Sequence, residues 1–219
     1  MRLEAWGIPC GGLFSTFIED DDLFFGGEEA LRQTLLEARM GRGDALLGVA
    51  VNCAPALIGD DVRGICTAFA PGVPVAVAEA GEFTGEFDNG YGKAFLAVLE
   101  ALRPVPCPPT PGAVNLIGFS PLEEHAAENL AESKRQLFRR GIEVHLTFGA
   151  PGTTVDSIRE AGRAALNVVL HEGRGQGIAA WLKEHLGQPS IFAPLSDAAN
   201  KKSGQLDAIE AALRMEKRR

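Results

Sequence analysis

The 219-residue sequence lacks the patterns that mark a membrane or secreted protein. A membrane-spanning helix needs about 18 consecutive apolar residues. The most apolar stretch, 45–59, is interrupted by Asn52 and Pro55. The N-terminus has no apolar run of the length that a secretory signal requires after a basic start. We therefore expect a cytoplasmic protein that makes no contact with a membrane.

Nucleotide-binding and zinc-binding motifs are missing as well. No G-x-G-x-x-G follows a first strand and no G-x-x-x-x-G-K-[ST] occurs, so we expect no NAD or ATP site of those kinds. The sequence has few cysteines, at positions 10, 53, 66 and 107. They form no C-x-x-C pair, and no histidine stands at zinc-finger spacing, which argues against a closed structural zinc site.

Positive charge is scarce in the first half of the chain. Residues 1–110 carry 7 basic and 16 acidic side chains, whereas residues 111–219 carry 14 and 13. The overall net charge of -8 repels phosphate backbones, so we expect no nucleic-acid partner. With 46% hydrophobic residues, the composition is that of a folded protein with a buried core.

Short apolar runs of strand length alternate with stretches at helical spacing, which is typical of parallel α/β folds. The spacing predicts strands over 45–51, 73–78, 114–118, 142–148, 165–171 and 190–192. It predicts helices over 28–40, 58–69, 90–102, 122–140, 154–162, 177–186 and 205–217, with Thr153 or Thr154 able to cap the fifth of these.

We interpret this alternation as an α/β fold of two Rossmann-like, doubly wound parallel-sheet layers. Five prolines within residues 104–112 disfavour helix and central strand, so this segment is the predicted linker. The expected organisation is a first Rossmann-like domain at 1–103, a second at 113–196 and a C-terminal helical segment at 197–219.

Ligands of such sheets bind beyond the carboxyl ends of the strands, which draws attention to two cysteines. Cys53 follows a buried strand directly, and its spacing alone favours a ligand and an ordinary thiol equally. Cys10 lies in a turn of small residues that would let a bulky cluster approach, although a plain loop thiol fits as well. Cys66 is expected to be a buried inert thiol, and Cys107 to be incidental.

Four segments in register resemble the nitrogenase component 1 superfamily. They are E-D-D-D-L-F-F-G-G-E-E-A-L at 19–31, C-x4-I-G-D-D-V at 53–62, the loop around Asp88-Asn89-Gly90, and V-N-L-I-G at 114–118. The superfamily includes nitrogenase molybdenum-iron subunits, cofactor-assembly scaffolds and light-independent protochlorophyllide reductases. The resemblance covers 8–195 and fades over 196–219. Because family subunits have three Rossmann-like domains, the chain resembles a truncated or reduced member.

The resemblance implies an iron–sulfur cluster, 4Fe-4S or larger, shared between two subunits. Cys10 and Cys53 match cysteines that ligate it, and thiolates suit iron as soft ligands. A third family cysteine has no counterpart here. The implied partners are a second copy or a paralogous component 1 subunit, and a separate ATP-dependent iron–sulfur reductase that donates electrons.

His171 matches the family position of the cysteine that holds the substrate-reducing cofactor. We therefore predict that His171 is catalytic and that the chain does not reduce dinitrogen. An imidazole can ligate iron, but a histidine bonded to a backbone carbonyl is a common structural alternative. His145 is expected to be structural, and His125 and His185 to face solvent.

Two functions follow as hypotheses. The first is an iron–sulfur oxidoreductase component that passes electrons to a substrate in an interdomain cleft. The second is a non-catalytic scaffold, or a protein that binds a small molecule or metallocofactor and has lost the redox site. The acidic run 19–22 could dock a basic electron donor, but a solvated loop is the preferred interpretation.

Overall fold

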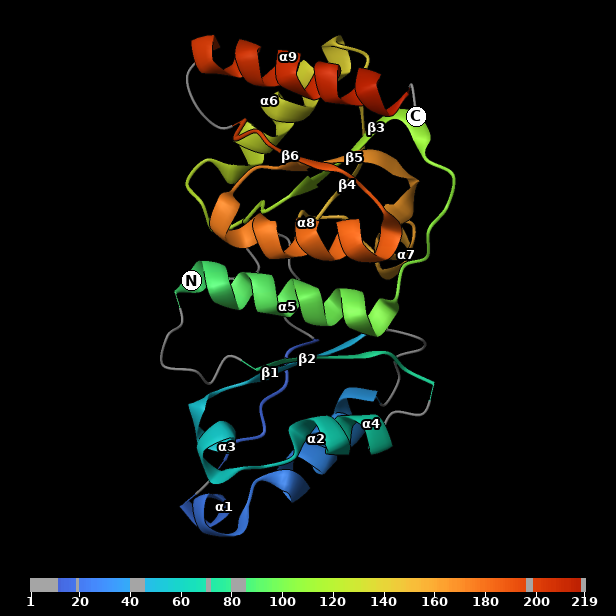
Figure 1. The fold of residues 1–219 in the computed structure, drawn as a ribbon. Coiled ribbons are helices and arrows are strands. Elements are labelled where there is room, and N and C mark those ends of the chain that lie inside the picture. The colour runs from blue at the N-terminus through green and yellow to red at the C-terminus, as the bar shows by residue number, and fades with distance from the viewer. Residues whose placement is uncertain are drawn as a thin grey trace. The chain divides into compact units, whose positions relative to one another are not determined.

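The computed structural model describes residues 12–18, 20–39, 46–69, 72–79, 86–195 and 199–217. The chain divides into two compact units, Met1–Leu102 and Arg103–Arg219. Within the described ranges, no helix is both long and apolar enough to cross a membrane. Figure 1 shows the elements of each unit, and both sheets are parallel.

The first unit is built around a two-stranded parallel sheet of β1 (Leu47–Val51) and β2 (Val75–Glu79). Its core is formed by apolar side chains of α2 (Glu28–Arg39) and α4 (Val62–Phe69) on one face of the sheet. The helix α5 (Phe87–Leu102) lies against β2 on the other face (Figure 1). Two short helices, α1 (Asp20–Phe25) and α3 (Cys53–Ile58), contact each other beside this sheet.

The second unit contains a four-stranded parallel sheet in the order β4-β3-β5-β6. Its strands are β3 (Thr110–Ile117), β4 (Glu143–Thr147), β5 (Ala164–Val169) and β6 (Ser190–Phe192). The helices α6 (Ala126–Arg139) and α9 (Ala199–Glu216) cover one face, and α8 (Glu172–Leu186) covers the other (Figure 1). A short helix α7 (Val155–Arg159) and a 3-10 turn (Ala161–Arg163) join β4 to β5. The unit therefore has the doubly wound, three-layer arrangement.

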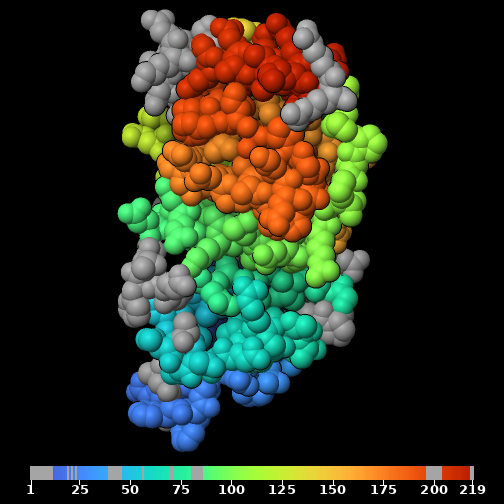
Figure 2. Space-filling model, viewed as in Figure 1, coloured from blue at the N-terminus to red at the C-terminus, as the bar shows by residue number. Residues whose placement is uncertain are grey.

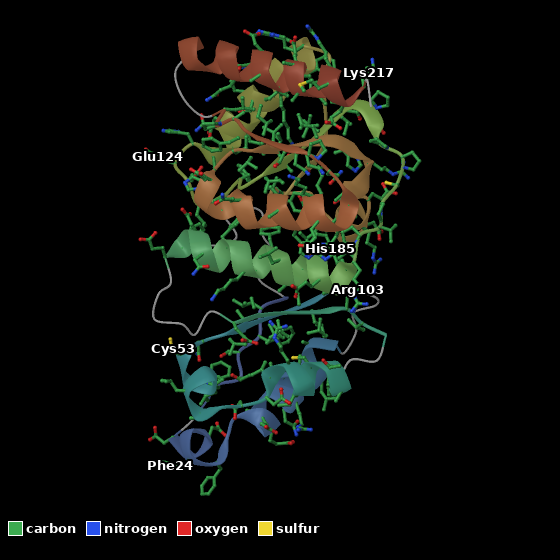
Figure 3. The ribbon with its side chains drawn as sticks, in the orientation of Figure 1. Phe24, Cys53, Arg103, Glu124, His185 and Lys217 are labelled. Atoms are coloured by element: carbon green, nitrogen blue, oxygen red, sulfur yellow. The ribbon has the colours of Figure 1, made fainter. Side chains whose placement is uncertain are left out.

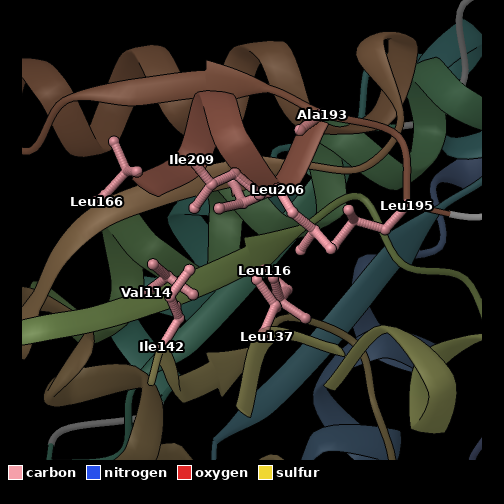
Figure 4. Close-up of a cluster of buried hydrophobic side chains, with 10 residues drawn as sticks. Val114, Leu116, Leu137, Ile142, Leu166, Ala193, Leu195, Leu206 and Ile209 are labelled. Carbon is pink, nitrogen blue, oxygen red and sulfur yellow. The ribbon is translucent and has the colours of Figure 1, made fainter. Parts of the chain in front are cut away.

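The face under α6 and α9 is closed by a cluster of fully buried aliphatic side chains (Figure 4). The strands contribute Val114, Leu116, Leu166 and Val168, α6 contributes Leu137, and α9 contributes Leu206 and Ile209. The Arg140 guanidinium adds an ion pair to α9, with Nη1 at 2.7 Å from Asp207 and 2.8 Å from Glu210. The C-terminal helix is thus part of the core, and its outer side is drawn red in Figure 2.

The fold class predicted from the alternation is confirmed, since both sheets are parallel and carry helices on their faces. The predicted cap of α7 is confirmed at Thr154, whose hydroxyl accepts the Ser157 N–H at 3.1 Å. The boundaries of α6 and α8 are shifted: α6 begins four residues later than predicted and α8 five residues earlier. The helix expected at 154–162 is α7 followed by the 3-10 turn.

Three expectations differ from the structure in kind. The helix predicted over 58–69 begins only at Val62, as α4, and the preceding helix α3 over Cys53–Ile58, which ends at Gly59 with a left-handed φ of 81°, was not predicted. Of the acidic run expected to be a loop, residues 20–22 form the start of α1, and Glu19 lies outside the described residues. The strand β3 starts at Thr110, inside the proline-rich segment, and its pairing with β5 is irregular until Val114. Proline at one end of a strand disrupts pairing only locally, so it does not exclude the strand.

Candidate functional site

The Cys53 thiol is exposed at the start of α3. The strand β1 ends at Val51, and the side chain of Asn52 caps the helix by accepting the Ala54 N–H at 3.1 Å. Cys53 is therefore the first helical residue, two positions beyond the carboxyl end of a parallel strand. Figure 3 shows its side chain beside the end of this strand. An exposed thiol at this point is accessible to a ligand or to a second protein.

The structure does not bring Cys53 together with other described metal ligands. Among the described residues, no three His, Cys, Asp or Glu side chains are placed to hold a metal ion together. Cys10, the other predicted ligand, lies outside the described residues. The described part of the chain thus offers one thiol at this place. Its donor chemistry suits iron, and a cluster bound here requires further thiolates from elsewhere.

The segments F-F-G-G and I-G-D-D, separated by thirty residues in the sequence, are in contact. Asp60 accepts the backbone N–H of Gly27 at 3.0 Å. A Cβ added at Gly26, which has a φ of 93°, would lie 3.0 Å from the other Asp60 oxygen. Asp61 accepts the Gly64 N–H at 2.8 Å in the first turn of α4. These residues fix the turns at the ends of α1 and α3, close in sequence to Cys53.

Replacing Asp60 with alanine is expected to lower the free energy of unfolding by about 1–2 kcal/mol, since the partly buried Gly27 N–H loses a charged acceptor. Chemical denaturation measures this change. The control is Asp20→Ala, at an exposed position in α1, for which we expect a much smaller change. Equal effects of the two substitutions would contradict a bridging role for Asp60.

His171 lies at the carboxyl end of β5, where it precedes α8. It is partly buried, and its side chain does not cap the helix. It lines a cavity of about 60 Å³ together with Gly118, Glu123 and Arg174. Gly118, which follows β3, has a φ of 88°, and a Cβ there would lie 3.0 Å from the His171 carbonyl oxygen. The ends of β3 and β5 are therefore packed closely around this cavity.

The remaining cysteines and histidines have structural surroundings. Cys66 is buried in the core of the first unit, and desolvation raises the pKa of its thiol, so it stays a neutral apolar group. Cys107 lines a separate cavity of about 200 Å³ in the second unit. His145 Nε2 lies 2.9 Å from the Glu160 carbonyl oxygen, as a structural histidine would. His125 is exposed, and His185 is exposed and stacks on Trp181 with ring centroids 4.1 Å apart.

A cavity of about 350 Å³ lies in the first unit between residues 12–16, α2 and β1. Its described lining is made of aliphatic side chains, Phe14, small hydroxyl residues and Asn52, with no titratable group. This described lining offers no charged ligand and no side-chain base that could activate its hydroxyl groups. The chemistry-bearing residues of the described chain are found at the strand ends instead.

Two polar features of the second unit were not predicted from the sequence. One is Arg174, which is buried on the inner side of α8 and paired with Glu123. Its spacing of four from Ile178 and eight from Leu182 could have revealed it, because that spacing puts a charge on the apolar face of the helix. The other is a set of buried amides, Asn115, Asn167 and Gln188.

The parallel α/β units and the segments around Cys53 are those of a nitrogenase-like oxidoreductase. Residues 4–216 match the sequence model of the family described as nitrogenase component 1 type oxidoreductase, and the chain belongs to this family. The match extends through α9, beyond residue 195, where the resemblance seen in the sequence ends.

Similar proteins include a subunit of the light-independent protochlorophyllide reductase from Rubrivivax gelatinosus. It is 31% identical over 159 residues, which cover 68% of this chain and 29% of that protein. A nitrogenase iron-molybdenum cofactor biosynthesis protein NifE from a Nostoc species is 31% identical over 182 residues, covering 81% of this chain and 37% of that one. The chain thus spans about a third of the length of these relatives.

The solved structure titled "Nitrogenase Cp1 at pH 5" has a similar fold. It superposes with a TM-score of 0.69 at 22% sequence identity, covering 90% of this chain and 43% of the other. This similarity shows that the chain shares the fold of that protein.

Proposed function

We propose that the chain is part of a component 1 subunit that ligates an iron–sulfur cluster through Cys10 and Cys53 at an interface with a second subunit. The observation that carries this proposal is the exposed Cys53 thiol at the start of α3, beside the turns that Asp60 fixes. When bound, the cluster would store and transfer electrons. The second subunit, a second copy or a paralogue, would supply the other thiolates.

In this proposal one residue of the first unit binds the cluster and one residue of the second unit faces the substrate. Cys53 holds iron through its thiolate. His171 faces the substrate from the carboxyl end of β5, where its imidazole can hold or donate a proton. Electrons arrive from a separate ATP-dependent iron–sulfur reductase and pass to a substrate. The protein acts in the cytoplasm.

A second candidate function is a scaffold or metallocofactor-binding protein without electron transfer. It is favoured by the similarity to a NifE protein, whose name describes cofactor biosynthesis, at the same identity as the similarity to a reductase subunit. Both candidates use the same fold, so they are separated by redox chemistry rather than by structure.

Substitution of Cys53 by serine tests the cluster site. The chain is purified anaerobically and reconstituted with iron and sulfide, and its iron content and visible charge-transfer absorption are measured. We expect a brown wild-type protein, and loss of most of the iron and absorption in Cys53→Ser, because a hydroxyl is a poor ligand for cluster iron.

Cys107→Ser is the matched control, since Cys107 is a partly exposed cysteine at a distance in sequence from the proposed ligands. It should retain the cluster. A colourless wild-type chain that takes up no iron would contradict the first function and leave the second. Equal iron uptake by Cys53→Ser and Cys107→Ser would remove Cys53 from the site.

A further inference from the structure

The cavity beside His171 occupies the place in the second unit where the chain changes direction across the sheet. From β3 the chain passes through α6, on one face, to β4, and from β5 it passes through α8, on the other face, to β6. The connections after neighbouring strands β3 and β5 thus leave toward opposite faces. In open α/β sheets, this switch point is where a crevice forms and ligands bind.

A positive charge is buried in this crevice. Arg174 is only 3% exposed, and its Nη2 donates a hydrogen bond to Oε1 of Glu123. A guanidinium cannot lose its proton in a protein, so at this depth it needs an anionic partner. The cavity is also lined by the apolar side chains of Phe119, Leu130, Leu170 and Leu195 and by the polar side chains of Asn129 and Ser133.

Glu123 differs from Arg174 in its exposure and its setting. Its side chain is 49% exposed, and it lies in the turn between β3 and α6 rather than in a helix or strand. The backbone bonds of this turn are long: Glu123 N–H to Ser120 O is 3.4 Å, and Ala126 N–H to Glu123 O is 3.3 Å. The carboxylate can therefore turn toward water, whereas Arg174 cannot leave the interior and then needs another anionic partner.

We propose that Arg174 binds an oxyanion, the carboxylate or phosphate group of a ligand, and that Glu123 occupies its place in the free protein. The cavity of about 60 Å³ admits one such group but no large cofactor. Arginine suits this role because its planar fork can hold two oxygens of a carboxylate or phosphate at once. Of the neighbouring charges, Glu172 is exposed and does not line the cavity, and His171 lines it.

This proposal goes beyond the cluster-based function and does not depend on it, because neither Arg174 nor Glu123 takes part in binding the cluster. The test therefore uses the full chain without iron. Thermal unfolding is followed with increasing citrate or inorganic phosphate, against sodium chloride at matched ionic strength. A ligand at free concentration c that binds the folded state stabilises it by RT ln(1 + c/Kd), so tighter binding gives a larger rise in the unfolding temperature at a given concentration.

Glu123→Gln removes the competing negative charge and keeps the shape of the side chain. We expect citrate, phosphate or both to bind this variant about tenfold more tightly than they bind the wild type, since a charged hydrogen-bond partner no longer competes. Glu160→Gln is the control, because Glu160 pairs with the exposed Arg163 at 3.2 Å and its loss frees a guanidinium already in water. It should show no change in anion response.

Arg174→Lys keeps the charge and loses the planar fork, so it should lose the anion response in the wild-type background. If Glu123→Gln does not fold, this variant still tests whether Arg174 binds the anion. Stabilisation by citrate alone would indicate a ligand with a carboxylate group. Stabilisation by phosphate alone would indicate a phosphorylated ligand. Stabilisation no greater than that by chloride in both wild type and Glu123→Gln, or an unchanged response in Arg174→Lys, would overturn the proposal.

Discussion

Replacing Asn167 with alanine is expected to lower the free energy of unfolding by about 2–4 kcal/mol. Asn167 is fully buried in β5 opposite Asn115 of β3. Its Oδ1 accepts a hydrogen bond from Asn115 Nδ2 at 2.9 Å, and its Nδ2 donates to Gln188 Oε1 at 3.4 Å. The substitution leaves a donor and an acceptor buried without these partners, and each such group costs about 1–3 kcal/mol.

The effect should be large because the rest of this amide cluster cannot compensate. Gln188 Nε2 is already bonded to the carbonyl oxygens of Ala161 and Ala164, at 2.9 and 2.7 Å. Asn115 Nδ2 also bonds the Ala161 carbonyl oxygen, at 3.0 Å, while its own Oδ1 is buried without a hydrogen-bond partner. The amides that remain are already committed to these hydrogen bonds. Loss of Asn167 therefore weakens the hydrogen-bond network of the whole cluster.

Denaturant unfolding measures the change, with Gln176→Ala as the control. Gln176 carries an amide on the exposed side of α8 in the same unit, and its loss should cost little beyond the noise of the measurement. A change for Asn167→Ala as small as that of Gln176→Ala would show that the amide cluster contributes no net stability. Because Asn167 joins β5 to β3 through its side-chain bond to Asn115, we also expect faster amide exchange around Gly118 and His171 in this variant.

The features predicted well from the sequence are those that depend on local pattern. Strands buried on both faces, such as β5, form almost continuous apolar runs that are visible without any knowledge of their neighbours. Helix ends marked by capping chemistry were also predicted, as at Thr154. Motif resemblance placed the chain in its family, and the match over residues 4–216 confirms that assignment.

The features missed depend on tertiary contacts. Arg174 and Glu123 are 51 residues apart, and no local pattern reveals that the two side chains meet. The same holds for Asn115 and Asn167, which look like single polar interruptions within two apolar strands until those strands are paired. The helix α3 and the late start of α4 were missed because the apolar spacing of α4 continues back to Ile58, whereas the left-handed Gly59 separates the two helices.

Substituting alanine for Gly118 is expected to lower the free energy of unfolding by about 3–4 kcal/mol, through two separable costs. The first is conformational. Gly118 has a φ of 88°, in the left-handed region that a side chain with Cβ disfavours by about 1–2 kcal/mol. The second is steric, because the new Cβ would lie 3.0 Å from the carbonyl oxygen and 3.1 Å from the backbone nitrogen of His171.

Gly187→Ala isolates the first of these costs. Gly187 ends α8 with a φ of 70°, and no described atom lies within 4 Å of a Cβ placed there. This variant is therefore destabilised only by the left-handed conformation. The difference between the two substitutions, about 2 kcal/mol, measures how tightly the ends of β3 and β5 are packed. Since the obstacle at Gly118 is backbone, Gly118→Ala must also displace His171 and reshape the cavity that holds Arg174. The contrary result is equal destabilisation by the two substitutions, with the amide signals of 171–175 unmoved. It would mean that the ends of β3 and β5 move apart without cost, and that Gly118 is required only for its left-handed conformation.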